Sequence, residues 1–152
     1  MDKIKLEEIK EKAFEIRCLT INEISTFGSG HIGGAMSITD LLALLYFDVM
    51  NVDPENPKKD DRDRLVVSKG HAGPAVYSTL ALKGYFDKSM LSTLNQGGTN
   101  LPSHCDMLKT PGIDFTAGSL GQGFSAAMGI ACGNRVKGVD AWTYTIIGDG
   151  ES

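Results

Sequence analysis

Residues 64–74 read RLVVSKGHAGP, in which a short apolar run gives way to a glycine-containing turn and then to a proline. Two of the first four residues are β-branched, which favours a strand over residues 64–67. Gly70 and Gly73 predict a turn, and Pro74 suits the first turn of a helix that runs to about Leu82. A strand that leads through a tight turn into a helix is a building unit of α/β folds.

The sequence on either side of this stretch continues the alternation of helix and strand. Apolar side chains recur every three or four positions near the N-terminus, which predicts an amphipathic helix that ends by Gly28; they are Leu6, Ile9, Ala13, Ile16, Thr20 and Ile24. A helix rich in small residues is expected over 123–135, and WTYTII at 142–147 reads as a second strand. The expected fold is therefore α/β, a parallel sheet with flanking helices, in one domain over residues 1–152.

Other segments are less regular. GSGHIGG at 28–34 reads as a loop. A capping box at 37–40 opens a helix that is apolar on nearly all of its faces, so we expect this helix to be buried. Its apolar residues are Leu41, Leu42, Leu44, Leu45, Phe47 and Met50. A short helix is expected at 89–94. Residues 95–118 have little periodicity, and so long an irregular stretch usually carries function.

Composition excludes several classes of protein. Fifteen basic against nineteen acidic residues give a net charge of −4, which argues against non-specific binding to nucleic acid or anionic membranes. The apolar run at 41–49 is too short to span a bilayer. Three cysteines without a C-x-x-C pair predict neither a disulfide framework nor a zinc ribbon, and together with a charged N-terminus they indicate a cytoplasmic protein.

Glycine is the unusual component. Eighteen of the 152 residues are glycine, well above the usual share of about 7%. Clusters of glycine in a folded chain mark strained turns or backbone that approaches a ligand. G-x-G-x-x-G at 28–33 matches the dinucleotide fingerprint, but that motif needs a preceding strand and here a helix precedes it, so we reject the match.

The three histidines, His31, His71 and His104, all lie in expected loops. Each alone could be an ordinary surface or core residue, and a zinc site is a second interpretation, although no i, i+4 pair supports it. The third interpretation is a group of imidazoles at the rim of one cleft, which would serve as donors, acceptors or acid–base groups.

Two glycine-rich turns are candidates for binding an anion and a cation. GSLGQG at 118–123 immediately precedes a helix, where backbone N–H groups suit an anion such as a diphosphate. GDG at 148–150 follows a strand, so Asp149 would lie where α/β sheets bind ligands and could hold Mg²⁺. Either turn could equally be an ordinary connection.

Taken together and in order, five motifs resemble the N-terminal half of transketolase. They are GHIGG at 30–34, DRDRLVVSKGHA at 61–72, LPSH at 101–104, TAGSLGQG at 116–123 and IGDGE at 147–151. Single-chain transketolases usually have Pro at the positions of Ile32 and Ser119 and Asn at the position of Lys69. The chain is therefore similar to the N-terminal subunit of the split, two-subunit type.

The resemblance implies a thiamine-diphosphate-binding (PP-type) fold and a transferase of the pentose phosphate pathway and carbohydrate metabolism. Such an enzyme moves a two-carbon ketol unit from a ketose phosphate to an aldose phosphate with thiamine diphosphate and Mg²⁺ or another divalent cation. Its site residues are implied as follows: Asp149 as the metal ligand; His71, Gly118, Ser119, Leu120 and Gly150 at the cofactor; His31 and His104 facing the substrate hydroxyls, with His31 the better candidate for proton transfer.

The resemblance also implies a partner, a C-terminal transketolase subunit, in an oligomer with the site at the interface. The family motif continues from Gly-Asp-Gly to an Asn pair that completes the metal shell, and this sequence stops at Ser152 before it. We therefore expect a domain that is incomplete at its C-terminus and negligible activity of the chain alone. The alternatives are another thiamine-diphosphate enzyme, of the deoxyxylulose-phosphate synthase or dehydrogenase E1 type, and a non-catalytic truncated remnant.

Overall fold

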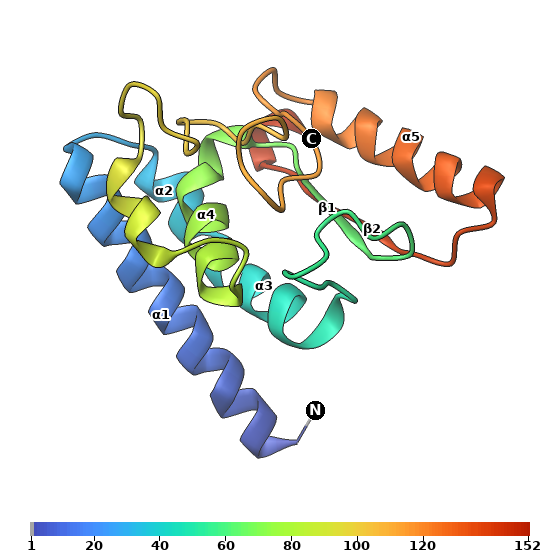
Figure 1. The fold of residues 1–152 in the computed structure, drawn as a ribbon, viewed down its shortest axis with the longest axis horizontal. Helices are drawn as coiled ribbons and strands as arrows, with labels where there is room; N and C mark the ends of the chain where they lie inside the picture. Colours follow the sequence, from blue (N-terminus) through green and yellow to red (C-terminus); the bar gives the residue numbers. More distant parts are fainter. Residues whose placement is uncertain (1) are drawn as a thin grey trace.

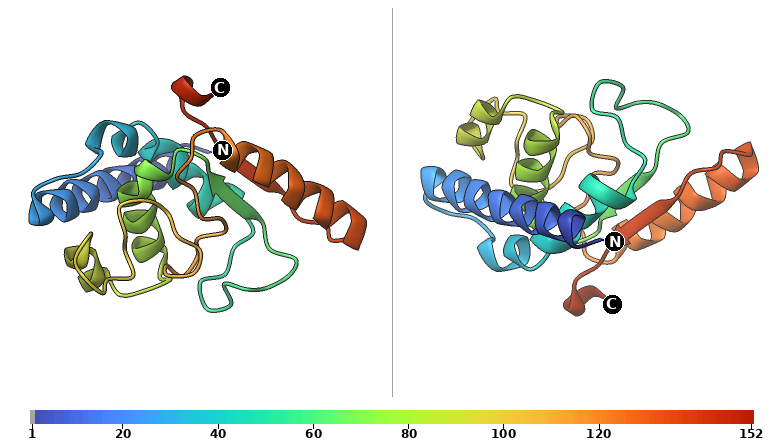
Figure 2. Two further views of the ribbon diagram at one scale, coloured as in Figure 1. Left: turned by 90° about the horizontal axis from the view of Figure 1, so that it is seen from above. Right: turned by 90° about the horizontal axis from the view of Figure 1, so that it is seen from below.

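Two parallel strands lie between a group of helices on one side and one long helix on the other in residues 2–152, which the structure, a computed structural model, describes. The strands are β1 (Arg64–Val67) and β2 (Thr143–Ile146). The helix α5 (Gln122–Lys137) packs against both strands, while α4 (Gly73–Lys83) and α1 (Lys3–Phe27) lie on the opposite side (Figures 1 and 2). This arrangement confirms the α/β class.

The register of the two strands brings their ends to the same edge. Arg64 pairs with Thr143 at the start of the strands, and Val67 pairs with Ile146 at the end. Parallel pairing requires a crossover, and α4 and α5 lie in the connection between the strands. Because both strands end at the same edge of the sheet, the turns that follow β1 and β2 are neighbours.

The main core lies between β1 and α4. Leu65 and Val67 point into it, and nine consecutive residues of α4, 73–81, are buried because this helix also contacts α1 on its other side. Pro74 stands in the first turn of α4, and the helix ends at Gly84, whose φ of +102° lies in the left-handed region. The helix expected over 74–82 is confirmed.

The long N-terminal helix is also confirmed. Asp2 caps α1 by accepting a hydrogen bond from the Lys5 N–H at 2.8 Å, and Gly28 ends it with a φ of +85°. The buried positions of α1 follow the predicted period and are Ile9, Ala13, Ile16, Thr20, Glu23 and Ile24. Glu23 is the one member of this set that the pattern does not predict.

Residues 28–50 differ from the expectation. The predicted loop at 28–34 gives way at Ile32 to a short helix, α2 (Ile32–Met36), in which Ala35 is fully buried. The predicted capping box is wrong: α3 (Thr39–Leu44) starts after Ile38 without a side-chain cap, because the Ser37 hydroxyl bonds the Gly34 carbonyl and accepts from Lys69 instead.

The segment after α3 is only partly buried. The α-helix passes into a π-helical turn at Leu45–Val49, and burial around the helix is incomplete because Leu41 and Val49 are 43% and 45% exposed. A 3₁₀ helix at Lys88–Thr93 replaces the short α-helix expected at 89–94. The thiols of Cys18, Cys105 and Cys132 are all free. None of the helices within residues 2–152 combines the length and the apolar composition that crossing a bilayer needs.

Candidate cofactor and substrate site

The carboxyl edge of the sheet brings together the turns that follow β1 and β2. The Ser68 N–H donates to the Ile146 carbonyl at 2.8 Å, which extends the ladder one residue beyond the strands. From there Lys69 and Gly70 lead into a 3₁₀ turn at Gly70–Ala72, and the other chain segment enters a 3₁₀ turn at Asp149–Glu151. This edge is where open α/β sheets bind ligands.

A cavity of about 270 Å³ lies between these turns. Its lining contains four of the residues for which the family resemblance implies a role at the cofactor or the metal: His71, Leu120, Asp149 and Gly150. Gly118 and Ser119 belong to the same turn as Leu120 but are exposed outside this cavity. Lys69, Gly148 and Glu151 complete the lining.

Asp149 and Gly150 are available to a ligand. Within residues 2–152 no hydrogen bond or ion pair uses the Asp149 carboxylate or the Gly150 N–H. A Cβ on Gly150 would meet nothing within 4 Å, so open space lies beside the backbone. A free carboxylate next to a free N–H, on the wall of a cavity, fits a hard divalent cation together with diphosphate oxygens.

The three histidines form one cluster. The ring centroids of His31 and His71 are 5.3 Å apart, those of His31 and His104 are 5.6 Å apart, and those of His71 and His104 are 6.3 Å apart. They come from the start of α2, the turn after β1 and the long irregular segment. The structure therefore brings together the imidazoles that the sequence placed in separate loops.

Burial and mutual repulsion favour the neutral forms of His71 and His104. Burial, followed by the neighbouring His31 and His104, lowers the pKa of His71, and burial together with His31 lowers the pKa of His104. The Ser103 hydroxyl lies 3.0 Å from His104 Nδ1. Neutral imidazoles can both donate and accept hydrogen bonds, which suits a polyhydroxylated ligand. Among residues 2–152 no three His, Cys, Asp or Glu side chains are arranged to hold a metal, so the zinc interpretation finds no support.

Glycine permits the close packing around the cluster. A Cβ on Gly34 would lie 2.9 Å from Cδ2 of His71, and a Cβ on Gly123 would lie 2.5 Å from the Cα of Ser68. The first contact holds α2 against the His71 ring, and the second holds the start of α5 against the end of β1. Part of the glycine excess is thus explained by the approach of backbone to the site.

Lys69 and Glu151 are site residues that sequence reasoning missed. Lys69 is 8% exposed, and its Nζ donates to the Gly34 carbonyl at 3.1 Å and to the Ser37 hydroxyl at 2.8 Å. Burial lowers the pKa of Lys69, although the Glu151 carboxylate opposes the shift. Burial also opposes ionisation of Glu151, but hydrogen bonds from Gly121, Gly148 and Ser68 outweigh it and lower its pKa. The available signal for Lys69 was a charged residue two positions after a buried strand and immediately before Gly-His.

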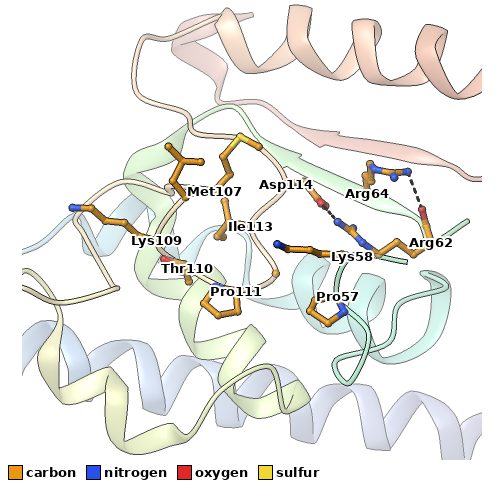
Figure 3. A pocket seen from close by; sticks show the side chains of 12 residues that line it. Pro57, Lys58, Arg62, Arg64, Met107, Lys109, Thr110, Pro111, Ile113 and Asp114 are labelled. Carbon is orange, nitrogen blue, oxygen red and sulfur yellow. Dashed lines mark hydrogen bonds and ion pairs between the residues drawn. The ribbon is translucent and has the colours of Figure 1, made fainter. Parts of the chain in front are cut away.

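A larger cavity, of about 560 Å³, lies at the start of β1, away from the edge that carries the histidines (Figure 3). Arg62 and Asp114 form an ion pair in its wall, and the second Asp114 oxygen accepts from the Leu65 N–H at 2.9 Å. These contacts tie the irregular segment 95–118 to β1. We therefore assign this ion pair to the fold, because it positions the segment that carries His104.

Comparison with known proteins identifies similar chains. The family described as "Transketolase, thiamine diphosphate binding domain" matches residues 9–151. The 6-deoxy-6-sulfo-D-fructose transketolase subunit of a Clostridium species is 57% identical over 145 residues, which cover 95% of this chain and 53% of that protein. An apulose-4-phosphate transketolase subunit of Phocaeicola vulgatus is 42% identical over 123 residues, covering 81% of this chain and 43% of the relative. The chain thus spans about half the length of these relatives.

Solved structures agree with the sequence comparison. Transketolase from Leishmania mexicana superposes with a TM-score of 0.86 at 34% identity, covering 93% of this chain and 23% of that one. Transketolase from Campylobacter jejuni gives a TM-score of 0.88 at 30% identity, covering 95% of this chain and 24% of that one.

Proposed function

Because this chain belongs to the transketolase family, as its thiamine-diphosphate-binding domain, we propose that it is the N-terminal subunit of a two-subunit transketolase. Residues 1–152 form the N-terminal part of one diphosphate-binding domain. The reaction is transfer of a two-carbon ketol unit between sugars. The observation that carries this proposal is the cavity at the carboxyl edge, where His71, Leu120, Asp149 and Gly150 meet beside the histidine cluster.

Residues of this cavity and of the turn before α5 would hold different parts of the cofactor. Asp149 would hold Mg²⁺ or another divalent cation, and the Gly150 N–H would meet the diphosphate. Gly118, Ser119 and Leu120 would line the cofactor from the turn before α5, and His71 would also contact it. When bound, thiamine diphosphate supplies the electron sink for breaking the carbon–carbon bond.

The histidines would bind the substrate hydroxyls and transfer a proton. The ring centroids of His31 and His104 lie 5.3 and 6.3 Å from that of His71, so both side chains can face the hydroxyls of a sugar bound over the cofactor. Their donors and acceptors would satisfy hydroxyl groups that lose water on binding. His31 is the candidate for moving a proton between a substrate hydroxyl and the site.

The substrates are sugars with a terminal anionic group. Ketose and aldose phosphates are the expected pair, and the name of the Clostridium relative adds a sulfonated ketose, 6-deoxy-6-sulfo-D-fructose. The two relatives described above are named as transketolase subunits, which favours ketol transfer over the deoxyxylulose-phosphate synthase and E1 alternatives. The proposed partner is a C-terminal transketolase subunit, and the site would lie at the interface between the two subunits. We place the assembled enzyme in the cytoplasm.

A ketol-transfer assay tests this proposal. With the rest of the domain and a C-terminal subunit supplied, and with Mg²⁺ and thiamine diphosphate, we expect turnover of a ketose phosphate or of 6-deoxy-6-sulfo-D-fructose with an aldose phosphate, and negligible turnover by the chain alone. His31→Asn should lower kcat by about 100-fold or more, the size of a general acid–base contribution. His104→Asn should act mainly by raising KM, because its role is to bind a hydroxyl.

The exposed Lys88→Gln serves as the control and should leave both constants unchanged. Turnover by the chain alone would contradict the requirement for a partner. Equal kcat values for the parent chain and His31→Asn would contradict the proton-transfer role. A fully assembled complex that transfers no ketol unit would favour a non-catalytic remnant.

A further inference from the structure

The Glu151 carboxylate joins three separate segments of the site. Its Oε2 accepts hydrogen bonds from the Ser68 hydroxyl and from the Gly121 N–H, each at 2.8 Å. Its Oε1 accepts from the Gly148 N–H, also at 2.8 Å. We propose that Glu151 is a positioning residue that locks the two glycine turns of the site together before any cofactor binds; the inference rests on the proposed function of those turns.

The segments that Glu151 joins are far apart in the chain. Ser68 precedes it by 83 residues and Gly121 precedes it by 30. Hydrogen bonds to an ionised carboxylate are shorter and about twice as strong as neutral ones. One side chain therefore ties the end of β1, the turn before α5 and the turn after β2 into one unit.

The shape of the turn before α5 depends on this contact. Gly121 has a φ of +84°, a left-handed conformation, and its N–H points to Glu151. Two residues later, Gly123 packs so closely on Ser68 that a Cβ would lie 2.5 Å from the Ser68 Cα. The hydrogen bond to Glu151 and the packing on Ser68 thus both hold this segment against the end of β1.

The two acidic residues after β2 have different environments. Both oxygens of Glu151 are used by protein donors, whereas within residues 2–152 the Asp149 carboxylate bonds no other group. Glu151 is therefore occupied in holding the turns, and Asp149 is left for the cation. The difference gives a natural matched control, since the two residues are two positions apart and carry the same charge.

Lys69 extends the locked unit toward the histidines. Its Cδ lies 3.6 Å from the position that a Cβ on Gly148 would take, and its Nζ holds the Gly34 carbonyl and the Ser37 hydroxyl of the α2 segment. Gly34 in turn contacts the His71 ring. A displacement of the Glu151 turns would therefore reach the histidine cluster through Lys69.

Amide hydrogen exchange on the full chain without cofactor tests the inference. In Glu151→Ala the Gly121 and Gly148 amides should exchange about tenfold faster or more, while amides of α4 such as those of Val76 and Leu80 stay protected. Asp149→Ala should leave the Gly121 and Gly148 amides unchanged. Unchanged exchange at both amides in Glu151→Ala would overturn the inference.

Two further variants keep the test decisive if Glu151→Ala does not fold. Glu151→Gln keeps an acceptor oxygen and should show intermediate exchange, and Ser68→Ala removes one of the three bonds and should speed Gly121 exchange less than Glu151→Ala does. If neither changes the exchange of the two amides, the inference is wrong.

Binding of thiamine diphosphate with Mg²⁺, measured with the rest of the domain and the C-terminal subunit present, separates this inference from the proposed function. Weaker binding by Glu151→Gln than by the parent chain supports the positioning role, and equal binding contradicts it. Absence of binding by the parent chain contradicts the proposed function, and the exchange measurement then decides on Glu151 by itself.

Discussion

Replacing Gly70 with alanine should destabilise the protein by about 3 kcal/mol or more, at or above the upper end of the usual cost of overpacking. A Cβ at this position would lie 2.1 Å from the carbonyl oxygen of Ala117 and 2.7 Å from its carbonyl carbon. The obstacle is backbone, which cannot rotate away as the end of a flexible side chain can. Gly70 is buried, so the clash cannot be relieved toward solvent.

The same substitution should damage the site. The Gly70 carbonyl accepts from the Cys105 N–H at 3.2 Å, and the Cys105 carbonyl accepts from the Ala117 N–H at 3.2 Å. Moving Ala117 would therefore displace the segment that connects His104 with the turn before α5. Urea unfolding compares Gly70→Ala with Gly97→Ala, at which a Cβ would meet nothing within 4 Å. Equal stabilities of the two variants would contradict this packing.

Replacing Glu23 with glutamine should stabilise the protein by about 3 kcal/mol at pH 7 and have little effect near pH 4. Glu23 is 2% exposed between α1 and α4. The Ser78 hydroxyl donates to its Oε1 at 2.9 Å, while Oε2 has no partner within the described residues. Burial raises the pKa of Glu23 from 4.5 to about 9, although the bond from Ser78 opposes the shift.

The sign of the pH dependence follows from the two protonation states. The unfolded chain releases the Glu23 proton above pH 4.5, whereas the native chain keeps it until about pH 9. Over that interval the unfolded state gains about 1.4 kcal/mol of relative stability per pH unit. The native state therefore weakens as the pH rises from 4.5 to about 9. Glutamine imitates the neutral acid and removes this loss.

Urea unfolding between pH 4 and pH 9 measures the effect. The free energy of unfolding of Glu23→Gln should depend less on pH than that of the parent chain, with the gap widening as the pH rises. Glu11→Gln, on the exposed face of the same helix, is the control and should follow the parent chain. Parallel curves for Glu23→Gln and the parent chain would show that Glu23 titrates normally.

Local patterns were sufficient to predict most of the elements. The helix period of α1, the β-branched residues of β1 and Pro74 at the start of α4 are signals that lie within each element, so tertiary contacts were not needed to recognise them. The helix α2 has two glycines in five residues and no such signal. It forms where Lys69 bonds the Gly34 carbonyl and the Ser37 hydroxyl, contacts that span more than thirty residues of sequence.

The site was predictable only in part for the same reason. Each histidine could be placed in a loop from its neighbours, but their separations of 5 to 6 Å depend on packing between distant segments. Asp149 is recognisable because the motif around it is local. Glu151 is not, since two of its three hydrogen bonds go to Ser68 and Gly121, and no spacing in the sequence marks either pair.

Isothermal titration calorimetry with thiamine diphosphate and Mg²⁺, on the chain completed by the rest of its domain and in the presence of a C-terminal transketolase subunit, tests the central claim most directly. We expect saturable binding that requires the cation and that Asp149→Ala weakens by about 100-fold, as loss of a metal-site residue can do. Binding should be weak when the partner subunit is left out. Tight binding that Asp149→Ala leaves unchanged would contradict the assignment of Asp149 and of the cavity at the carboxyl edge of the sheet.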